Sequence, residues 1–162
     1  MNEKDNFLNS WNGEFQTTLK VLNAYPNDRP DFKPHERSRS AKELAWTFVI
    51  EEKGAVAGVI SGKIDFNNMP KPPATFKEVI QEYEKSHKEM VNKFKDLSED
   101  ELNNMMKFFV APKKMGDMRK IDVLWSILRD MIHHRGQLSV YVRMTGGKVP
   151  SIYGPTADEP WN

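Results

Sequence analysis

Apolar side chains recur every three or four residues in four long stretches of the chain. The first stretch runs from about Lys4 to Ala24, and its apolar residues at this spacing are Phe7, Trp11, Phe15, Leu19 and Leu22. The others run from Ser40 to about Ile60, from Thr75 to Leu97, and from about Lys120 to Thr145. Such spacing places apolar groups on one face of a helix, so the pattern predicts four long helices.

Capping signals and prolines predict where these helices begin and end. Ser40 to Glu43 and Thr75 to Glu78 have the form of a capping box, in which a hydroxyl and a glutamate bond backbone amides at a helix start. The pair Gly146 and Gly147 ends the last helix. Proline-rich linkers at residues 26–34 and 67–73 are long enough for crossover connections between non-adjacent helices.

The segment between the third and fourth long helices is less regular. A third capping signal at Ser98 predicts a short helix that includes Met105 and Met106. Residues 108–110 are predicted to be extended, and residues 112–116 to form a turn.

Three glycines, Gly54, Gly58 and Gly62, are spaced by four within the second predicted helix. Each glycine costs a helix roughly 1 kcal/mol relative to alanine, so three on one face need a reason. Either a bulky neighbour packs closely against this face, or the helix frays toward an active-site loop.

Length and composition limit the class of protein. A chain of 162 residues, 38% apolar and 29% charged, suits one globular domain. A net charge of +1 and the lack of a nucleic-acid motif give no reason to expect a nucleic-acid partner. The absence of cysteine excludes disulfides and thiolate ligands, and no apolar stretch predicts a signal peptide or membrane span, which favours a cytoplasmic protein. We therefore predict an all-α four-helix bundle with long crossover connections, in a single domain of residues 1–162.

The densest polar cluster lies within the most apolar helix. Asp130, His134, Gln137 and Tyr141 follow one another at steps of four, three and four, which forms a polar stripe. An Asp and a His one helical turn apart present two ligand atoms to the same side, as half of a metal site would. A satisfied internal hydrogen-bond network is the alternative reading. His133 is an alternative ligand, three residues after Asp130.

The second helix carries further candidates for the same pocket. Thr47 and Glu51 share a face one turn apart, and either Glu51 or Glu52 could supply a carboxylate or lie in solvent. Trp46 either lines the pocket or anchors the core. On the third helix, His87 is expected to be structural or solvated.

Three segments resemble the DinB/YfiT-like family. They are HHRGQLSVYVR at residues 133–143, GKVPSIYGP at residues 147–155, and the second helix from Ser40 to Glu52. The resemblance implies a four-helix bundle that is often dimeric and holds a divalent metal with three histidines. Some members of the family are transferases or isomerases that use a low-molecular-weight thiol.

The family's three histidine positions correspond here to Thr47, Asp130 and His134, so only one histidine is retained. Asp130 can still bind a divalent ion, and Glu51 is the nearest substitute for the third ligand. We therefore predict that His134, Asp130 and Glu51 hold zinc or nickel weakly or not at all. The residues predicted to line the pocket are Thr47, Trp46, Gln137, Tyr141 and His133.

Two functional hypotheses follow from this pattern. The first is a DinB-like protein with a degenerate metal pocket that acts as a metal-dependent enzyme, either a thiol-dependent transferase or a hydrolase. The second is a non-catalytic bundle that binds a small molecule or a partner. A homodimer is also expected, because the last helix is apolar on more than one face and the glycine face permits close approach.

Overall fold

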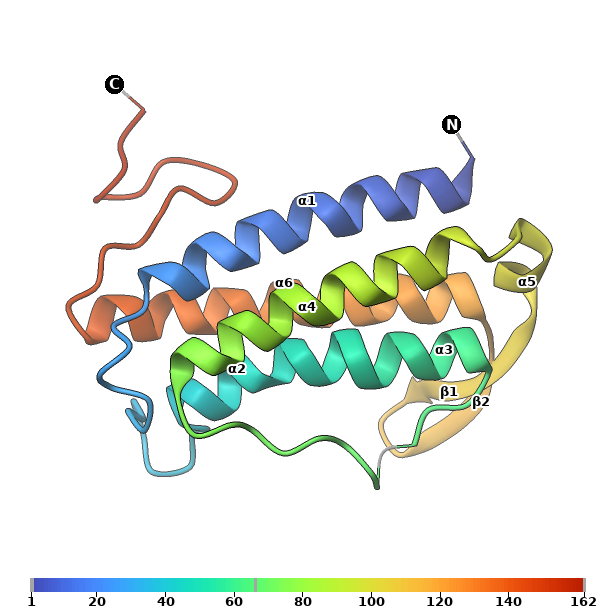
Figure 1. The fold of residues 1–162 in the computed structure, drawn as a ribbon, viewed down its shortest axis with the longest axis horizontal. Helices are drawn as coiled ribbons and strands as arrows, with labels where there is room; N and C mark the ends of the chain where they lie inside the picture. Colours follow the sequence, from blue (N-terminus) through green and yellow to red (C-terminus); the bar gives the residue numbers. More distant parts are fainter. Residues whose placement is uncertain (1, 66, 162) are drawn as a thin grey trace.

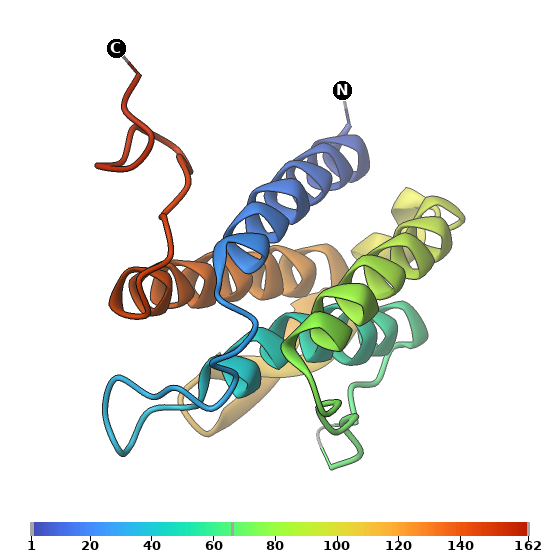
Figure 2. The ribbon, with the colours of Figure 1, turned by 60° about the vertical axis from the view of Figure 1, so that its left-hand side comes forward.

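Four helical rods lie side by side in the computed structural model, which describes residues 2–65 and 67–161 (Figures 1 and 2). The elements in chain order are α1 (Glu3–Ala24), α2 (Ala41–Val49), η1 (Ile50–Val56), α3 (Ala57–Ser61), α4 (Phe76–Lys95), α5 (Glu99–Asn103), β1 (Met105–Ala111), β2 (Lys114–Arg119) and α6 (Lys120–Met144). The rods are α1, the continuous run of α2, η1 and α3, then α4 and α6. The four predicted long helices are therefore present.

The predicted helix starts are confirmed by their hydrogen bonds. Complete capping boxes open α2 at Ser40, α4 at Thr75 and α5 at Ser98, each with a glutamate at the third helical position. These caps satisfy backbone amides that would otherwise lack partners at the helix ends.

The prediction of an all-α fold is confirmed only in part, because a small antiparallel hairpin accompanies the helices. The short helix α5 ends at Asn103, so Met105 and Met106, which were predicted to be helical, lie in β1. β1 pairs with β2 in a register that sets Met106 opposite Met118, and Lys113 adopts a positive φ of 59° in the tight turn between them. Aromatic and β-branched residues in β1 favour the extended chain over another helical turn.

The second rod changes its hydrogen-bond pattern in the middle. Residues Ile50–Val56 form a π-helix, whose bonds span five residues instead of four. Gly54 within this π-helix and Gly58 after it permit close packing, as one interpretation of the sequence predicted. A Cβ on Gly54 would lie 2.6 Å from Met69 Sδ, and one on Gly58 would lie 2.7 Å from Ile64 Cα. The linker that follows α3 therefore covers the glycine face at Gly54 and Gly58.

The inner faces of the rods form one apolar core, which encloses two paired groups, Arg135 and His87. Arg135 on α6 is almost fully buried, and its Nη1 lies 2.6 Å from Glu14 Oε2 on α1. His87 on α4 is buried and structural, since its Nδ1 lies 2.9 Å from Glu52 Oε1. Among the described residues, no helix is both long and apolar enough to cross a membrane.

Candidate metal centre and its cavity

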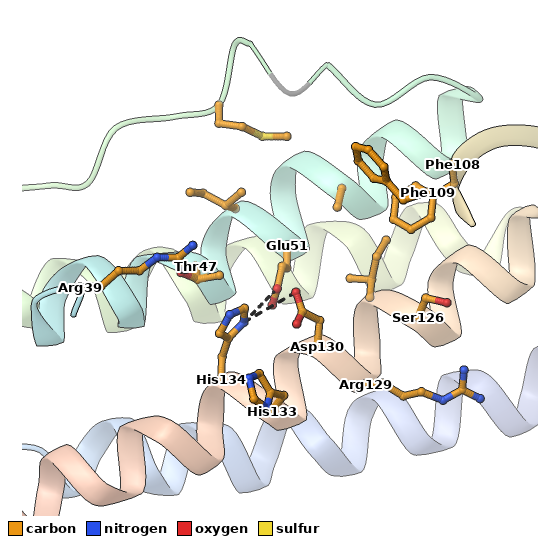
Figure 3. Close-up of a pocket in the computed structure, with 14 residues that line it drawn as sticks. Arg39, Thr47, Glu51, Phe108, Phe109, Ser126, Arg129, Asp130, His133 and His134 are labelled. Atoms are coloured by element: carbon orange, nitrogen blue, oxygen red, sulfur yellow. Dashed lines mark hydrogen bonds and ion pairs between the residues drawn. The ribbon is translucent and has the colours of Figure 1, made fainter. Parts of the chain in front are cut away.

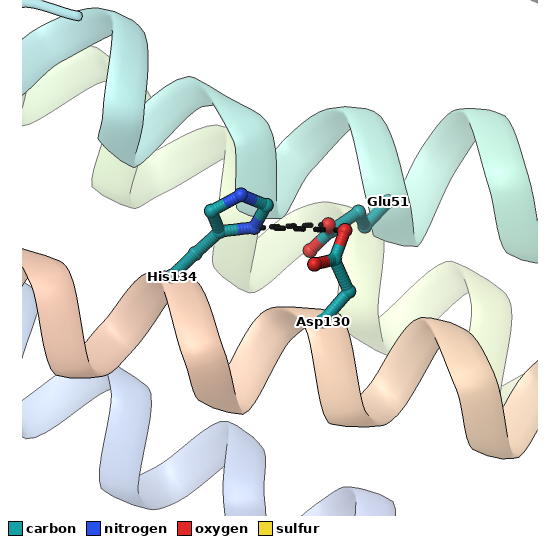
Figure 4. Close-up of side chains that lie close together, drawn as sticks. All are labelled: Glu51, Asp130 and His134. Carbon is teal, nitrogen blue, oxygen red and sulfur yellow. Dashed lines mark hydrogen bonds and ion pairs between the residues drawn. The ribbon is translucent and has the colours of Figure 1, made fainter. Parts of the chain in front are cut away.

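Three acidic or imidazole side chains meet between η1 and α6 (Figure 4). They are Glu51, Asp130 and His134, and each offers a ligand atom within 4.8 Å of the others. His134 Nδ1 lies 3.2 Å from Glu51 Oε1 and 3.9 Å from Asp130 Oδ2. We refer to these three residues as the triad.

The local helix geometry explains how the triad assembles. Asp130 and His134 are one turn apart on α6 and so point to the same side. Glu51 and Glu52 are consecutive residues of η1 and point to different sides of it. Glu51 faces the triad, whereas Glu52 faces the core and accepts a hydrogen bond of 2.8 Å from Trp11 Nε1. The sequence leaves open which of the two glutamates reaches the pocket, and in the structure it is Glu51.

The triad is partly withdrawn from water. The side chains of Glu51 and His134 are 10% and 12% exposed, whereas that of Asp130 is 58% exposed. Burial raises the pKa of Glu51 to about 7, although its hydrogen bond to His134 acts in the opposite direction. The same hydrogen bond raises the pKa of His134. The protonation of Glu51 is therefore coupled to that of His134.

The triad lines an elongated cavity of about 730 Å³ (Figure 3). Arg39 and Thr47 lie at one end, the triad lies in the middle, and Phe108 and Phe109 of the hairpin lie at the other end. This volume is in the usual range for small-molecule sites.

Thr47, at the position of the family's first histidine, lines the cavity with its hydroxyl already engaged. Its Oγ1 donates to the Glu43 carbonyl at 3.2 Å and accepts from Arg39 Nη1 at 2.9 Å. A guanidinium therefore stands beside the hydroxyl where the resemblance implies a metal ligand.

The other residues predicted to line the pocket lie in different places. His133 lines the cavity but is outside the triad, and its Nε2 lies 2.8 Å from Gln137 Nε2. Gln137 and Tyr141 border a neighbouring hollow, where the Tyr141 hydroxyl donates to the Arg39 carbonyl at 3.1 Å. Trp46 is buried, lines a separate hollow, and donates from Nε1 to a linker carbonyl at 2.7 Å.

Sequence reasoning missed nine of the residues that line the cavity, among them Arg39, Met69, Phe108 and Phe109. The apolar run that contains the two phenylalanines was a signal for a strand, but nothing in it indicated contact with the site. Arg39 precedes a helix cap and Met69 lies in a linker, and neither position belongs to a periodic pattern.

The donor set suits a divalent cation. Two carboxylates and one imidazole match the ligands of zinc and of harder divalent ions. Glu51 Oε2 is buried and has no hydrogen-bond partner among the described residues. A buried carboxylate oxygen without a partner is costly, and a coordinated ion would satisfy it.

The chain belongs to the DinB family, whose sequence profile matches residues 1–161. It is 26% identical over 161 residues to the uncharacterized protein YrdA of Bacillus subtilis (strain 168), covering 96% of this chain and 90% of YrdA. The expected resemblance is therefore confirmed.

Two crystal structures of DinB-like proteins have the same fold. That from Bacillus cereus ATCC 10987 has a TM-score of 0.77 and 22% identity, covering 92% of this chain and 97% of the other. That of YjoA from Bacillus subtilis has a TM-score of 0.72 and 20% identity, covering 91% and 96%. At these identities the likeness concerns the fold alone.

Proposed function

We propose that this protein is a metal-dependent enzyme whose reaction takes place at the triad of Glu51, Asp130 and His134. The observation that carries the proposal is the convergence of three ligand atoms within 4.8 Å inside a cavity of small-molecule size. Hydrolysis and thiol-dependent transfer both fit such a site, because both need an activated nucleophile beside a bound substrate.

A divalent ion in this site would lower the pKa of a bound water or thiol and polarise a substrate carbonyl. The chain's own residues hold the ion and position the substrate. Glu51 would hold the ion as a carboxylate, because metal binding displaces the proton that burial favours in the metal-free protein. Asp130, which is more exposed, stands at the solvent side of the triad.

We propose that the ion is held weakly and exchanges readily. The triad contains only one imidazole, and the Thr47 hydroxyl is engaged by Arg39 and Glu43. The same observation favours a second candidate function, a non-catalytic bundle that binds a small molecule in the cavity without a metal. The two candidates differ in whether ligand binding needs the ion.

Calorimetric titration with zinc and nickel, after removal of metal with a chelator, tests the site. We expect one equivalent to bind with micromolar or weaker affinity, at roughly −8 kcal/mol or less favourable. His134→Ala should abolish binding, because it removes the only imidazole of the triad. His133→Ala is the matched control, since this neighbouring histidine lines the cavity outside the triad, and it should bind as the native protein does. Loss of metal binding in both variants, or in neither variant, would contradict the ligand assignment.

A second experiment rebuilds the family's ligand set. Thr47→His combined with Asp130→His should bind zinc much more tightly than the native protein, because three imidazoles would then face the cavity. Nanomolar affinity of the native protein, with no gain in the double variant, would contradict a weak native site.

We also propose a homodimer in the cytoplasm. The side of α6 that faces away from the core carries two large exposed apolar residues, Val140 and Met144 at 54% and 52% exposure. They lie one turn apart, so they form a small stripe that a symmetry-related copy could cover.

A further inference from the structure

We infer that the cavity binds a molecule with a carboxylate at one end, an apolar group at the other, and the reacting bond between them. The inference deepens the proposed function and rests on it for the reacting bond, which would lie at the triad. The two ends are argued from side chains that the proposed function does not use: Arg39 for the carboxylate, and the hairpin phenylalanines for the apolar group.

Arg39 offers a guanidinium with most of its donors free. One donor, Nη1, reaches Thr47 Oγ1, and no carboxylate among the described residues forms an ion pair with Arg39. Glu43, four residues further along the chain, is occupied by the cap of α2, where its carboxylate accepts from Ser40 N at 2.7 Å. A guanidinium has five N–H groups in a planar fork that suits a carboxylate, so this one can bind an anion from solution.

Arg39 lines the same cavity as the triad (Figure 3). A divalent ion would offset the two negative charges of Glu51 and Asp130, which leaves Arg39 as the uncompensated charge beside the site. Arg129 also lines the cavity, but its side chain extends along α6 away from the triad (Figure 3). The loaded site would therefore attract a single negative charge at the Arg39 end.

The opposite end of the cavity is apolar. The rings of Phe108 and Phe109 lie there (Figure 3), and Met69, Ile50 and Ile127 also line the cavity. Aromatic walls of this kind bind an aryl or alkyl group by burial of apolar surface.

The order along the cavity sets the order of groups in the ligand. Arg39 and Thr47 come first, the triad is in the middle, and the phenylalanines come last (Figure 3). A molecule with its carboxylate on Arg39 and its apolar group at the hairpin must cross the triad with the bonds in between. An acylated amino acid has this order of carboxylate, amide and apolar acyl group, and so it belongs to the class we infer.

The inference is tested by titrating the zinc-loaded protein with N-(4-fluorobenzoyl)glycine and measuring the binding by fluorine NMR. The matched neutral probe is the primary amide of the same compound. We expect the acid to bind about tenfold or more tightly than the amide, as a charge-assisted pair requires. Arg39→Gln should remove this preference by weakening the acid alone, and Arg39→Lys should keep part of it. Arg37→Gln is the control, because Arg37 is equally a surface residue and does not line the cavity.

Repeating the titration in chelator separates this inference from the proposed function. If zinc fails to bind but the acid is still preferred in an Arg39-dependent way, the proposed function is wrong and the carboxylate site stands. If zinc binds at the triad but acid and amide bind equally, or Arg39→Gln changes nothing, the inference is overturned and the metal site stands. Circular dichroism of each variant checks that the fold is retained.

Discussion

Two adjacent glutamates on η1 have opposite surroundings. Glu52 is fully buried and bonded to Trp11 and His87, which fixes this turn of the rod against α1 and α4. Each glutamate has one buried oxygen without a hydrogen-bond partner among the described residues, but only Glu51 lines the cavity. Glu51 is therefore available to a ligand, while Glu52 holds this part of the backbone in place.

The shifted pKa of Glu51 predicts how stability depends on pH in metal-free protein. Its pKa in the fold is about 7, above the ordinary value of 4.5, so the folded state binds more protons than the unfolded state between these values. The stabilisation is present below pH 4.5 and is lost as pH rises through 7. The raised pKa of His134 acts in the same direction.

We expect Glu51→Gln to flatten this dependence and to raise the free energy of unfolding at pH 8 by roughly 2–3 kcal/mol, because an amide needs no proton. Urea unfolding in chelator at pH 5 and pH 8 measures both effects. Glu84→Gln, at an exposed site on α4, should keep the native difference between the two pH values. The same pH difference in Glu51→Gln would contradict the assignment.

At the scale of residues, part of the site could be predicted and part could not. Asp130 and His134 share one helix, and the helical period alone sets them on one side. Glu51 lies on the second rod. The direction in which its side chain points depends on the π-helix that begins at Ile50, where hydrogen bonds span five residues instead of four. Arg39 reaches the cavity through a long, flexible side chain from a position with no periodic signal.

At the scale of elements, the helices could be predicted because their apolar repeat and their caps agree. The hairpin could not be predicted in full. Residues 108–110 were expected to be extended. The other residues of β1 are in a strand because they pair with β2, the segment directly before α6. Pairing between strands is a tertiary contact, and local preference does not determine it.

The glycine face of the second rod yields a prediction at this scale. Gly58→Ala should lower the free energy of unfolding by about 1–3 kcal/mol, because its methyl group would overlap the backbone of Ile64. Gly13→Ala on α1 is the control, since a Cβ there has no neighbour within 4 Å, and it should raise stability by about 1 kcal/mol through helix preference. Chemical denaturation measures both, and a stabilising Gly58→Ala would show that the linker gives way.

At the scale of the whole molecule, the cavity is a product of packing between parts far apart in the chain. The second rod and α6 supply its floor, the linker after α3 contributes Met69, and the hairpin contributes Phe108 and Phe109. Periodicity and caps predicted the rods, but they carry no information on how a linker and a hairpin close over one pair of rods.

The structure changes the argument for the dimer while leaving it a prediction. The glycine face, one of its two supports, is covered by the chain's own linker at Met69 and Ile64. Most of the apolar surface of α6 is buried within the chain as well. The remaining support is the exposed stripe of Val140 and Met144.

The stripe makes the dimer testable by substitution. A symmetric interface buries each substituted residue twice, so two charges placed there should separate the copies. We expect sedimentation velocity at micromolar concentration to give about twice the mass of the chain for the native protein, and the mass of one chain for Val140→Glu combined with Met144→Glu. Met105→Glu, at an equally exposed apolar site on the hairpin, should remain dimeric. A native protein that stays monomeric across the concentration range would reject the dimer, and a dimer that survives the double substitution would place its interface elsewhere.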